Sequence, residues 1–192
     1  MSIKGTKTEQ CLMKAFAGES QARNRYTLFS MKAADDGYMQ ISDIFLKIAE
    51  QEKEHAELFA DFFEGSEVEI TATFPAFFPD TKTTTVKNLQ AAIAGEHDEW
   101  TKLYHEFAEI AKIEGFNDVS ERFTKIASIE RTHNRIFKNI LDCLQKDEVF
   151  KSKHDETWCC AKCGYDVYGK ESPSECPNCG EKGYYYMYGR EF

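Results

Sequence analysis

The chain has 192 residues, which is enough for one medium-sized domain and a small second one. Its formal net charge is −9, which argues against a nucleic-acid partner because nucleic-acid phosphates repel an acidic surface. No apolar run in the sequence is long enough to span a bilayer, and its first residues contain no apolar signal-peptide core. We therefore expect a cytoplasmic protein with no membrane partner.

Most of the chain has the apolar spacing of amphipathic helices. Four helices are predicted, over about 6–34, 39–64, 86–114 and 116–145. Thr6 or Thr8 can cap the first helix, and Gly37, Gly65 and Gly115 stand where the first three helices are expected to end. The sequence thus predicts an all-α bundle over residues 1–146.

Residues 66–85 lack the helical pattern and predict a long crossover between the second and third helices. A bundle with one such crossover is a known arrangement of four helices. The segment contains Phe74, Phe77 and Phe78. We expect these side chains to pack over the bundle or over a partner subunit.

Each predicted helix carries an acidic residue that can reach a common centre. Two helices contain a Glu-x-x-His pair, whose members share one helix face: Glu52 with His55, and Glu130 with His133. The other two helices contain Glu19 and Glu96, each after an Ala-Gly pair. This set matches the ligands of a carboxylate-bridged two-metal site in a four-helix bundle. One pair alone would indicate a solvated charged face, but the repetition favours a buried site that suits iron or manganese.

The bundle also contains an internal repeat. The sequence around Glu52 returns 78 residues later, and the sequence around Glu19 returns 77 residues later at Glu96. Tyr26 returns after 78 residues as Tyr104, so one residue has been inserted between Glu96 and Tyr104. Because helices commonly absorb an extra residue as a π-bulge, we predict one within 96–104.

Glu99 lies in this predicted bulge and has no carboxylate counterpart on the first helix. The third helix therefore offers a second carboxylate, one turn after Glu96. The alternative is that Glu99 is an ordinary surface side chain.

Residues 158–192 form a small unit after a polar linker at 147–157. It contains two Cys-x-x-Cys pairs, a spacing that closes a tetrahedral metal site: Cys160, Cys163, Cys176 and Cys179. A structural zinc ribbon uses the same spacing, so the cysteines alone do not decide the metal. We expect Trp158, Tyr165 and Tyr185 to form the aromatic core of this unit, and with the neighbouring two-metal bundle they favour iron as a one-electron carrier. We exclude Cys159 from the predicted metal site because Cys160 is the cysteine with the two-residue spacing to Cys163.

With these motifs the sequence resembles the rubrerythrin family over its whole length. The resemblance is carried by Ala-Phe-Ala-Gly-Glu-Ser-Gln-Ala-Arg-Asn-Arg-Tyr at 15–26, the two Glu-x-x-His pairs, Gly95-Glu96-x-x-Glu99 and the two cysteine pairs. It implies a ferritin-like four-helix bundle with a C-terminal rubredoxin-like domain. It also implies an oxo- and carboxylate-bridged pair of non-haem irons in the bundle and one iron in the four-cysteine site.

The resemblance further implies roles for single residues. The family positions that bind the oxidised iron pair correspond to Glu19, Glu52, Glu96, Glu99, Glu130 and His133. The position of His55 takes over from that of Glu99 when iron is reduced. Tyr26 and Tyr104 match family tyrosines that hydrogen-bond ligand carboxylates, the alternative being two ordinary core tyrosines. Glu99, His55, Tyr26 and Tyr104 are thus the candidate catalytic residues.

The function implied by the resemblance is a peroxidase that reduces hydrogen peroxide to water in oxidative-stress defence. Its electrons would come from NAD(P)H through a reductase or a rubredoxin and then the four-cysteine iron. A head-to-tail homodimer or a higher homo-oligomer is implied as well. One alternative is a ferroxidase or iron-storage protein, against which the attached electron carrier argues. Another is a non-enzymatic module with a zinc ribbon on a structural metal bundle.

Overall fold

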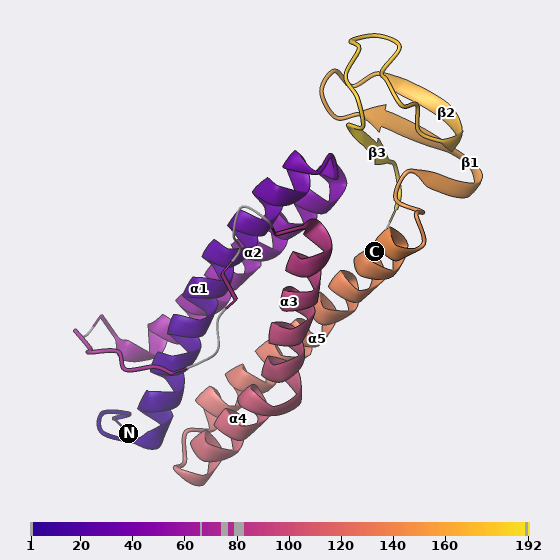
Figure 1. The fold of residues 1–192 in the computed structure, drawn as a ribbon. Helices are drawn as coiled ribbons and strands as arrows, with labels where there is room; N and C mark the ends of the chain where they lie inside the picture. The colour runs from indigo at the N-terminus through magenta and orange to yellow at the C-terminus, as the bar shows by residue number, and fades with distance from the viewer. Residues whose placement is uncertain (1, 66, 74–76, 79–82, 191) are drawn as a thin grey trace.

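The computed structural model describes the chain except residues 1, 66, 74–76, 79–82 and 191, and consists of a helical bundle with a small sheet at one end (Figure 1). The helical elements are α1 (Lys7–Asp35), α2 (Met39–Ala60), the 3-10 turn η1 (Asp61–Phe63), α3 (Thr85–Asp98), the π-helix η2 (Glu99–Leu103), α4 (Tyr104–Ile113) and α5 (Asn117–Gln145). Helix α1 packs along α2, while α3, η2 and α4 together pack along α5. None of the described helices is both long and apolar enough to cross a membrane.

The predicted third helix is present, and the predicted π-bulge is confirmed. The extra residue is absorbed by η2, which starts at Glu99 and ends just before Tyr104. The second helix is shorter than predicted, because α2 ends at Ala60 and the chain tightens into η1. Glu64 then adopts a left-handed conformation (φ +51°), which no helix can continue through.

The internal repeat in the sequence is visible in how the two helical pairs cap one another. Asp36, at the end of α1, accepts hydrogen bonds from the backbone N–H and the hydroxyl of Thr85 at the start of α3. Glu114, at the end of α4, accepts the same two bonds from Thr8 at the start of α1. Each half of the bundle therefore satisfies free N–H groups at the start of a helix in the other half.

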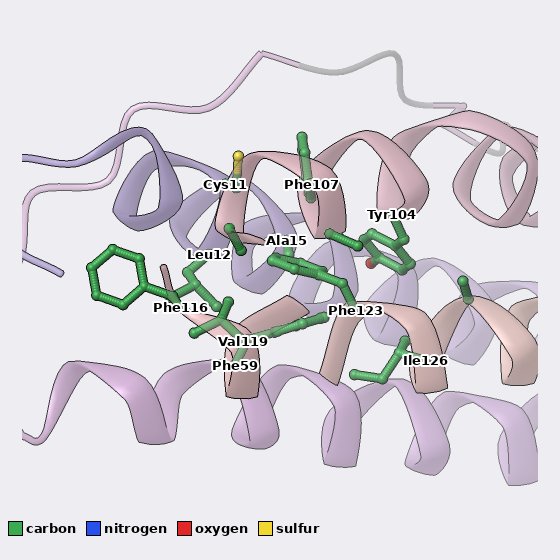
Figure 2. Close-up of a cluster of buried hydrophobic side chains, with 13 residues drawn as sticks. Cys11, Leu12, Ala15, Phe59, Tyr104, Phe107, Phe116, Val119, Phe123 and Ile126 are labelled. Atoms are coloured by element: carbon green, nitrogen blue, oxygen red, sulfur yellow. The ribbon is translucent and has the colours of Figure 1, made fainter. Parts of the chain in front are cut away.

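Two aromatic clusters fill the bundle on either side of its middle. One contains Phe59, Phe107 and Phe123, with the rings of Phe59 and Phe123 5.0 Å apart (Figure 2). The other contains Phe45 and Phe137, whose rings are 5.1 Å apart. The polar residues discussed below lie between the two clusters, where packing holds their helices in place.

The crossover between η1 and α3 is described only in part, and Phe74 lies outside the described residues. Phe77 packs over the bundle as expected, with its ring 6.1 Å from that of Phe29. Phe78 instead is 81% exposed in the single chain, so its predicted packing on the bundle is wrong. The other expected partner of this side chain, a second subunit, stays a prediction.

The C-terminal unit is a three-stranded antiparallel sheet in the order β2-β1-β3, made of β1 (Lys151–Cys160), β2 (Asp166–Glu171) and β3 (Tyr185–Met187). The predicted linker at 147–157 is shorter in the structure, because residues from 151 onward belong to β1 and pair within the sheet. Trp158 and Tyr185 form the core as expected, and the Trp158 indole N–H donates to the Gly169 carbonyl at 2.8 Å. Tyr165 is 45% exposed, so its predicted place in that core is wrong.

The sheet is attached to the end of the bundle where α2 begins (Figure 1). Gln40 of α2 donates to the Met187 carbonyl of β3 at 3.3 Å, and Tyr186 donates to the Asp43 carboxylate. The rings of Tyr38 and Phe150 stack with their centroids 5.9 Å apart. These contacts join the small unit to its own bundle at one end, well away from the middle.

Candidate metal centre

Six of the seven predicted bundle ligands meet in the middle of the bundle as two overlapping groups. The first group is Glu19, Glu52, His55 and Glu130, and the second is Glu52, Glu96, Glu130 and His133, with the ligand atoms of each group within 4.8 Å of one another. Glu52 and Glu130 belong to both groups. The arrangement is that of two metal positions bridged by two carboxylates.

Both histidines face the shared carboxylates with the same ring nitrogen. His55 Nδ1 lies 2.9 Å from Glu130 Oε1 and 3.0 Å from Glu52 Oε2. His133 Nδ1 lies 2.8 Å from Glu130 Oε2 and 3.1 Å from Glu52 Oε1. Each bridging carboxylate therefore offers one oxygen to each side of the centre, which is the geometry of a bridging ligand.

The centre is buried, and its chemistry fits a pair of iron ions. All six side chains are at most 4% exposed. Glu19 Oε2 and Glu96 Oε2 have no hydrogen-bond partner among the described residues. Buried carboxylate oxygens without partners are costly, and cations satisfy several of them at once. Carboxylate oxygens with two imidazoles form a donor set that suits iron.

The pKa values show how the centre balances its charge without metal. Burial favours neutral histidines, but hydrogen bonds to Glu130 and Glu52 outweigh it and raise the pKa of His55 to about 10 and of His133 to about 9. Burial also works to raise the pKa of Glu52, yet hydrogen bonds from His133 and His55 lower it to about 2. Burial and neighbouring glutamates raise the pKa of Glu19 and Glu96 well above the usual range. Protons and metal ions would therefore compete for these carboxylates and imidazoles.

Two buried tyrosines hydrogen-bond the terminal carboxylates, as expected. Tyr26 donates to Glu96 Oε1, and Tyr104 donates to Glu19 Oε1. Each tyrosine therefore holds the glutamate of the other half of the repeat. Burial, followed by the adjacent glutamate, raises the pKa of both phenols well above the usual range, so both hydroxyls stay protonated and donate.

Glu99, the seventh predicted ligand, lies outside both groups. It is half-buried and borders a cleft of about 550 Å³ between α1 and α3, which is also lined by Gly18, Arg25, Phe77 and Gly95. Burial and then the charges of Glu130 and Glu52 raise its pKa well above the usual range. Glu99 is therefore a carboxylate next to the centre that has open space beside it.

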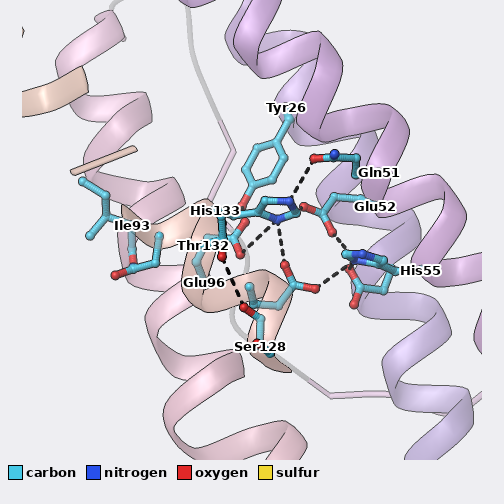
Figure 3. Close-up of polar contacts among 12 residues, drawn as sticks. Tyr26, Gln51, Glu52, His55, Ile93, Glu96, Ser128, Thr132 and His133 are labelled. Atoms are coloured by element: carbon cyan, nitrogen blue, oxygen red, sulfur yellow. Dashed lines mark hydrogen bonds and ion pairs between the residues drawn. The ribbon is translucent and has the colours of Figure 1, made fainter. Parts of the chain in front are cut away.

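One polar contact of the centre was not predicted from the sequence. Gln51, from α2, lies with its side-chain oxygen 3.0 Å from His133 Nε2 (Figure 3). Metal-binding histidines commonly hydrogen-bond through their second ring nitrogen in this way. Gln51 directly precedes Glu52, but no spacing rule distinguishes it from a surface glutamine.

The four predicted cysteines of the small unit come together at a second site. Their sulfurs lie within 4.8 Å of one another, with Cys160 and Cys179 3.8 Å apart and Cys163 and Cys176 3.7 Å apart. The turn after each pair closes at a glycine with positive φ, Gly164 at +71° and Gly180 at +73°. Cys159 is not part of the group, which confirms its exclusion.

The bundle and the first centre define a ferritin-like protein of the di-iron carboxylate class, to which the small unit adds a rubredoxin-like site. The family model described as Rubrerythrin matches residues 10–151. The chain is 46% identical over 185 residues to the rubrerythrin of Porphyromonas gingivalis, covering 96% of this chain and 91% of the relative. It is 44% identical over 179 residues to that of Nitratidesulfovibrio vulgaris, covering 93% and 92%.

Solved structures agree with this assignment. A structure of nigerythrin in a mixed-valence state matches with a TM-score of 0.63 and 27% identity, over 96% of this chain and 87% of that one. A bacterioferritin of Desulfovibrio desulfuricans matches with a TM-score of 0.65 at 23% identity, over 74% and 82%, and supports the fold alone. The chain belongs to the rubrerythrin family. Its cofactors are a di-iron pair in the bundle and one iron in the four-cysteine site, and the family implies an oxidoreductase of oxidative-stress defence.

Proposed function

We propose that the chain is a peroxidase that reduces hydrogen peroxide to two molecules of water with two electrons and two protons. The observation that carries this proposal is that one chain combines a buried two-metal centre beside an open cleft with a separate four-cysteine site. When bound and ferrous, the iron pair supplies the two electrons that cleave the O–O bond. Because iron storage needs no electron return, the four-cysteine site makes a ferroxidase the weaker alternative.

In this proposal Glu99 and His55 exchange places at the centre. Glu99 has the space of the cleft to move into, and its departure would leave room for peroxide beside the iron pair. Burial and the charges of Glu130 and Glu52 raise the pKa of its carboxyl, so in this proposal Glu99 would carry the proton that goes to the leaving hydroxide. His55 would then hold the iron in place of Glu99, while Tyr26 and Tyr104 keep the carboxylates of Glu96 and Glu19 in place.

The position of the small unit supports electron transfer between chains. It is attached to α2 at Gln40, and Glu52 lies twelve residues further along the helix. At 1.5 Å per residue, Gln40 and Glu52 are roughly 18 Å apart along the helix, so the small unit is attached at a distance from the centre of its own bundle. We therefore propose a head-to-tail homodimer in the cytoplasm, in which the four-cysteine iron of one chain serves the bundle of the other. A reductase or rubredoxin would pass electrons from NAD(P)H to that iron.

Rapid mixing tests the activity. The protein is reduced fully without oxygen and mixed with stoichiometric peroxide or with dioxygen, and the visible band of the four-cysteine iron is followed. Fast reoxidation by peroxide and slow reoxidation by dioxygen are expected. The opposite preference would indicate an oxidase or ferroxidase, and the lack of a visible band would mean zinc in the small unit.

Two sets of variants test the mechanism. Glu99→Ala should slow peroxide turnover without changing the fold, whereas Glu109→Ala, at an exposed position of α4, should leave turnover unchanged. Full turnover in Glu99→Ala would exclude the exchange of ligands.

In mixed dimers, one chain carries Cys163→Ser with Cys179→Ser and the other carries Glu52→Ala. Electron transfer between the two intact sites is expected, and its absence would rule out the head-to-tail arrangement.

A further inference from the structure

The two histidines of the centre are equivalent on the side that faces the carboxylates. Each Nδ1 lies within 3.1 Å of both Glu52 and Glu130. Each also has one more distant glutamate, Glu19 at 4.0 Å from His55 and Glu96 at 3.8 Å from His133. The rings are nearly parallel, with an interplanar angle of 22°, and are 4% and 2% exposed. Neither burial nor these inner contacts explain why one histidine should move and the other stay.

The outer ring nitrogens are where the two histidines differ. His133 Nε2 lies 3.0 Å from the side-chain oxygen of Gln51, which reaches it from α2 (Figure 3). The internal repeat places Ile129 of α5 at the position that corresponds to Gln51. A hydrocarbon side chain accepts no hydrogen bond, and all the polar contacts of His55 with described residues are made by Nδ1, so its Nε2 has no acceptor among them.

We infer that Gln51 is a positioning residue that fixes the ring of His133, and that Ile129 leaves the ring of His55 free to turn by withholding the same contact. A ring whose Nδ1 faces the metal carries its proton on Nε2, and an acceptor there fixes both the tautomer and the ring orientation. This inference rests on the proposed function, in which His55 alone exchanges with Glu99.

The chain thus departs from its repeat at two places that favour movement of His55. At one, η2 supplies Glu99 where α1 has no carboxylate. At the other, α5 supplies Ile129 where α2 has Gln51. The first departure adds a ligand that can leave, and the second frees the histidine that can replace it.

Exchanging the two side chains tests the inference. Gln51 is exposed and Ile129 is 39% exposed, so Gln51→Ile, Ile129→Gln and the double variant are compatible with the fold. Lys125→Gln, one turn earlier on α5 with a side chain 69% exposed, controls for an added amide on that helix. The first readout uses the metal-free protein: two-dimensional ¹⁵N–¹H spectra of the imidazole rings and the solvent exchange of their N–H protons.

In the wild type we expect a protected Nε2–H on His133 and a rapidly exchanging one on His55. Gln51→Ile should remove the protection at His133, and Ile129→Gln should create it at His55, with Lys125→Gln unchanged. Equal exchange at both rings in the wild type would overturn the inference, whatever the protein catalyses. Gln51→Ile should also weaken the binding of zinc to the metal-free bundle about tenfold, as is typical when such a partner is lost.

The second readout links the ring contact to turnover. Ile129→Gln should slow peroxide turnover about tenfold, because a fixed His55 exchanges less readily with Glu99, while zinc binding to the metal-free bundle should not weaken. If His55 becomes protected but turnover is unchanged, the inference about His55 is wrong and the peroxidase proposal stands. If the wild type does not turn over peroxide at all, the proposed function fails, and the ring spectra still decide whether Gln51 fixes His133.

Discussion

Replacing Tyr26 by phenylalanine removes one hydroxyl group from the centre and little else. The ring is 1% exposed, and its contact with Phe137, at a centroid distance of 5.3 Å, remains in the variant. The hydroxyl donates to Glu96, whose side chain is itself 1% exposed, so water cannot readily replace the lost bond. An acceptor left buried without its partner costs about 1–3 kcal/mol.

Urea unfolding of the metal-free protein, followed by the helical circular dichroism signal, measures this cost. With a slope of about 2–3 kcal/mol per molar urea, the midpoint should fall by roughly 0.3–1.5 M. Tyr104→Phe should have the same effect through Glu19, because the repeat makes the two bonds equivalent. Tyr168→Phe, at a site 73% exposed, is the control and should leave the midpoint unchanged.

The same variants should weaken metal binding. The Tyr26 hydrogen bond lowers the pKa of Glu96 against the larger effect of burial, so its loss raises that pKa further and lets protons compete better with zinc. Calorimetric titration with zinc measures the difference. If Tyr26→Phe matches the wild type in both midpoint and zinc affinity, the hydroxyl contributes nothing to the centre and the reasoning fails.

Three further predictions concern the core, the charge balance and a turn. Phe123→Ala should lower the free energy of unfolding by about 3–5 kcal/mol, because the side chain is 0% exposed and leaves a large cavity; a loss below about 1 kcal/mol in urea titrations would contradict this. The metal-free protein should lose stability as pH rises from about 6.5, the usual pKa of histidine, to the raised pKa values of His133 (about 9) and His55 (about 10). Over that range the folded state binds more protons than the unfolded chain, so raising the pH favours unfolding. Melting temperatures measured across that range test this, and a flat profile would contradict it. Gly37→Ala should cost about 1–2 kcal/mol, measured by urea unfolding, because the turn holds φ at +87°, and an unchanged midpoint would show that the turn adapts.

The parts of the fold that could be predicted from the sequence depend on local geometry. In any helix, residues three apart share a face, so Glu52 with His55 and Glu130 with His133 form pairs wherever their helices lie. The π-helix was predictable for a similar reason, because the one-residue change of offset between Glu96 and Tyr104 has to be absorbed inside one helix. The cysteine pairs likewise form their own turns at Gly164 and Gly180.

The remaining features were decided by tertiary structure, because they join residues that lie far apart in the chain. Tyr26 and Glu96 are 70 residues apart, Tyr104 and Glu19 are 85 apart, and Gln51 and His133 are 82 apart. The resemblance predicted that the tyrosines bond ligand carboxylates but not which glutamate each one holds. The attachment of the sheet through Gln40 and the exposure of Tyr165 also follow from how separate elements pack. The sequence by itself determined which residues can bind metal, because helix periodicity and turn chemistry are local. Only the packing of the helices determined which partner each ligand has, and with it the difference between His55 and His133.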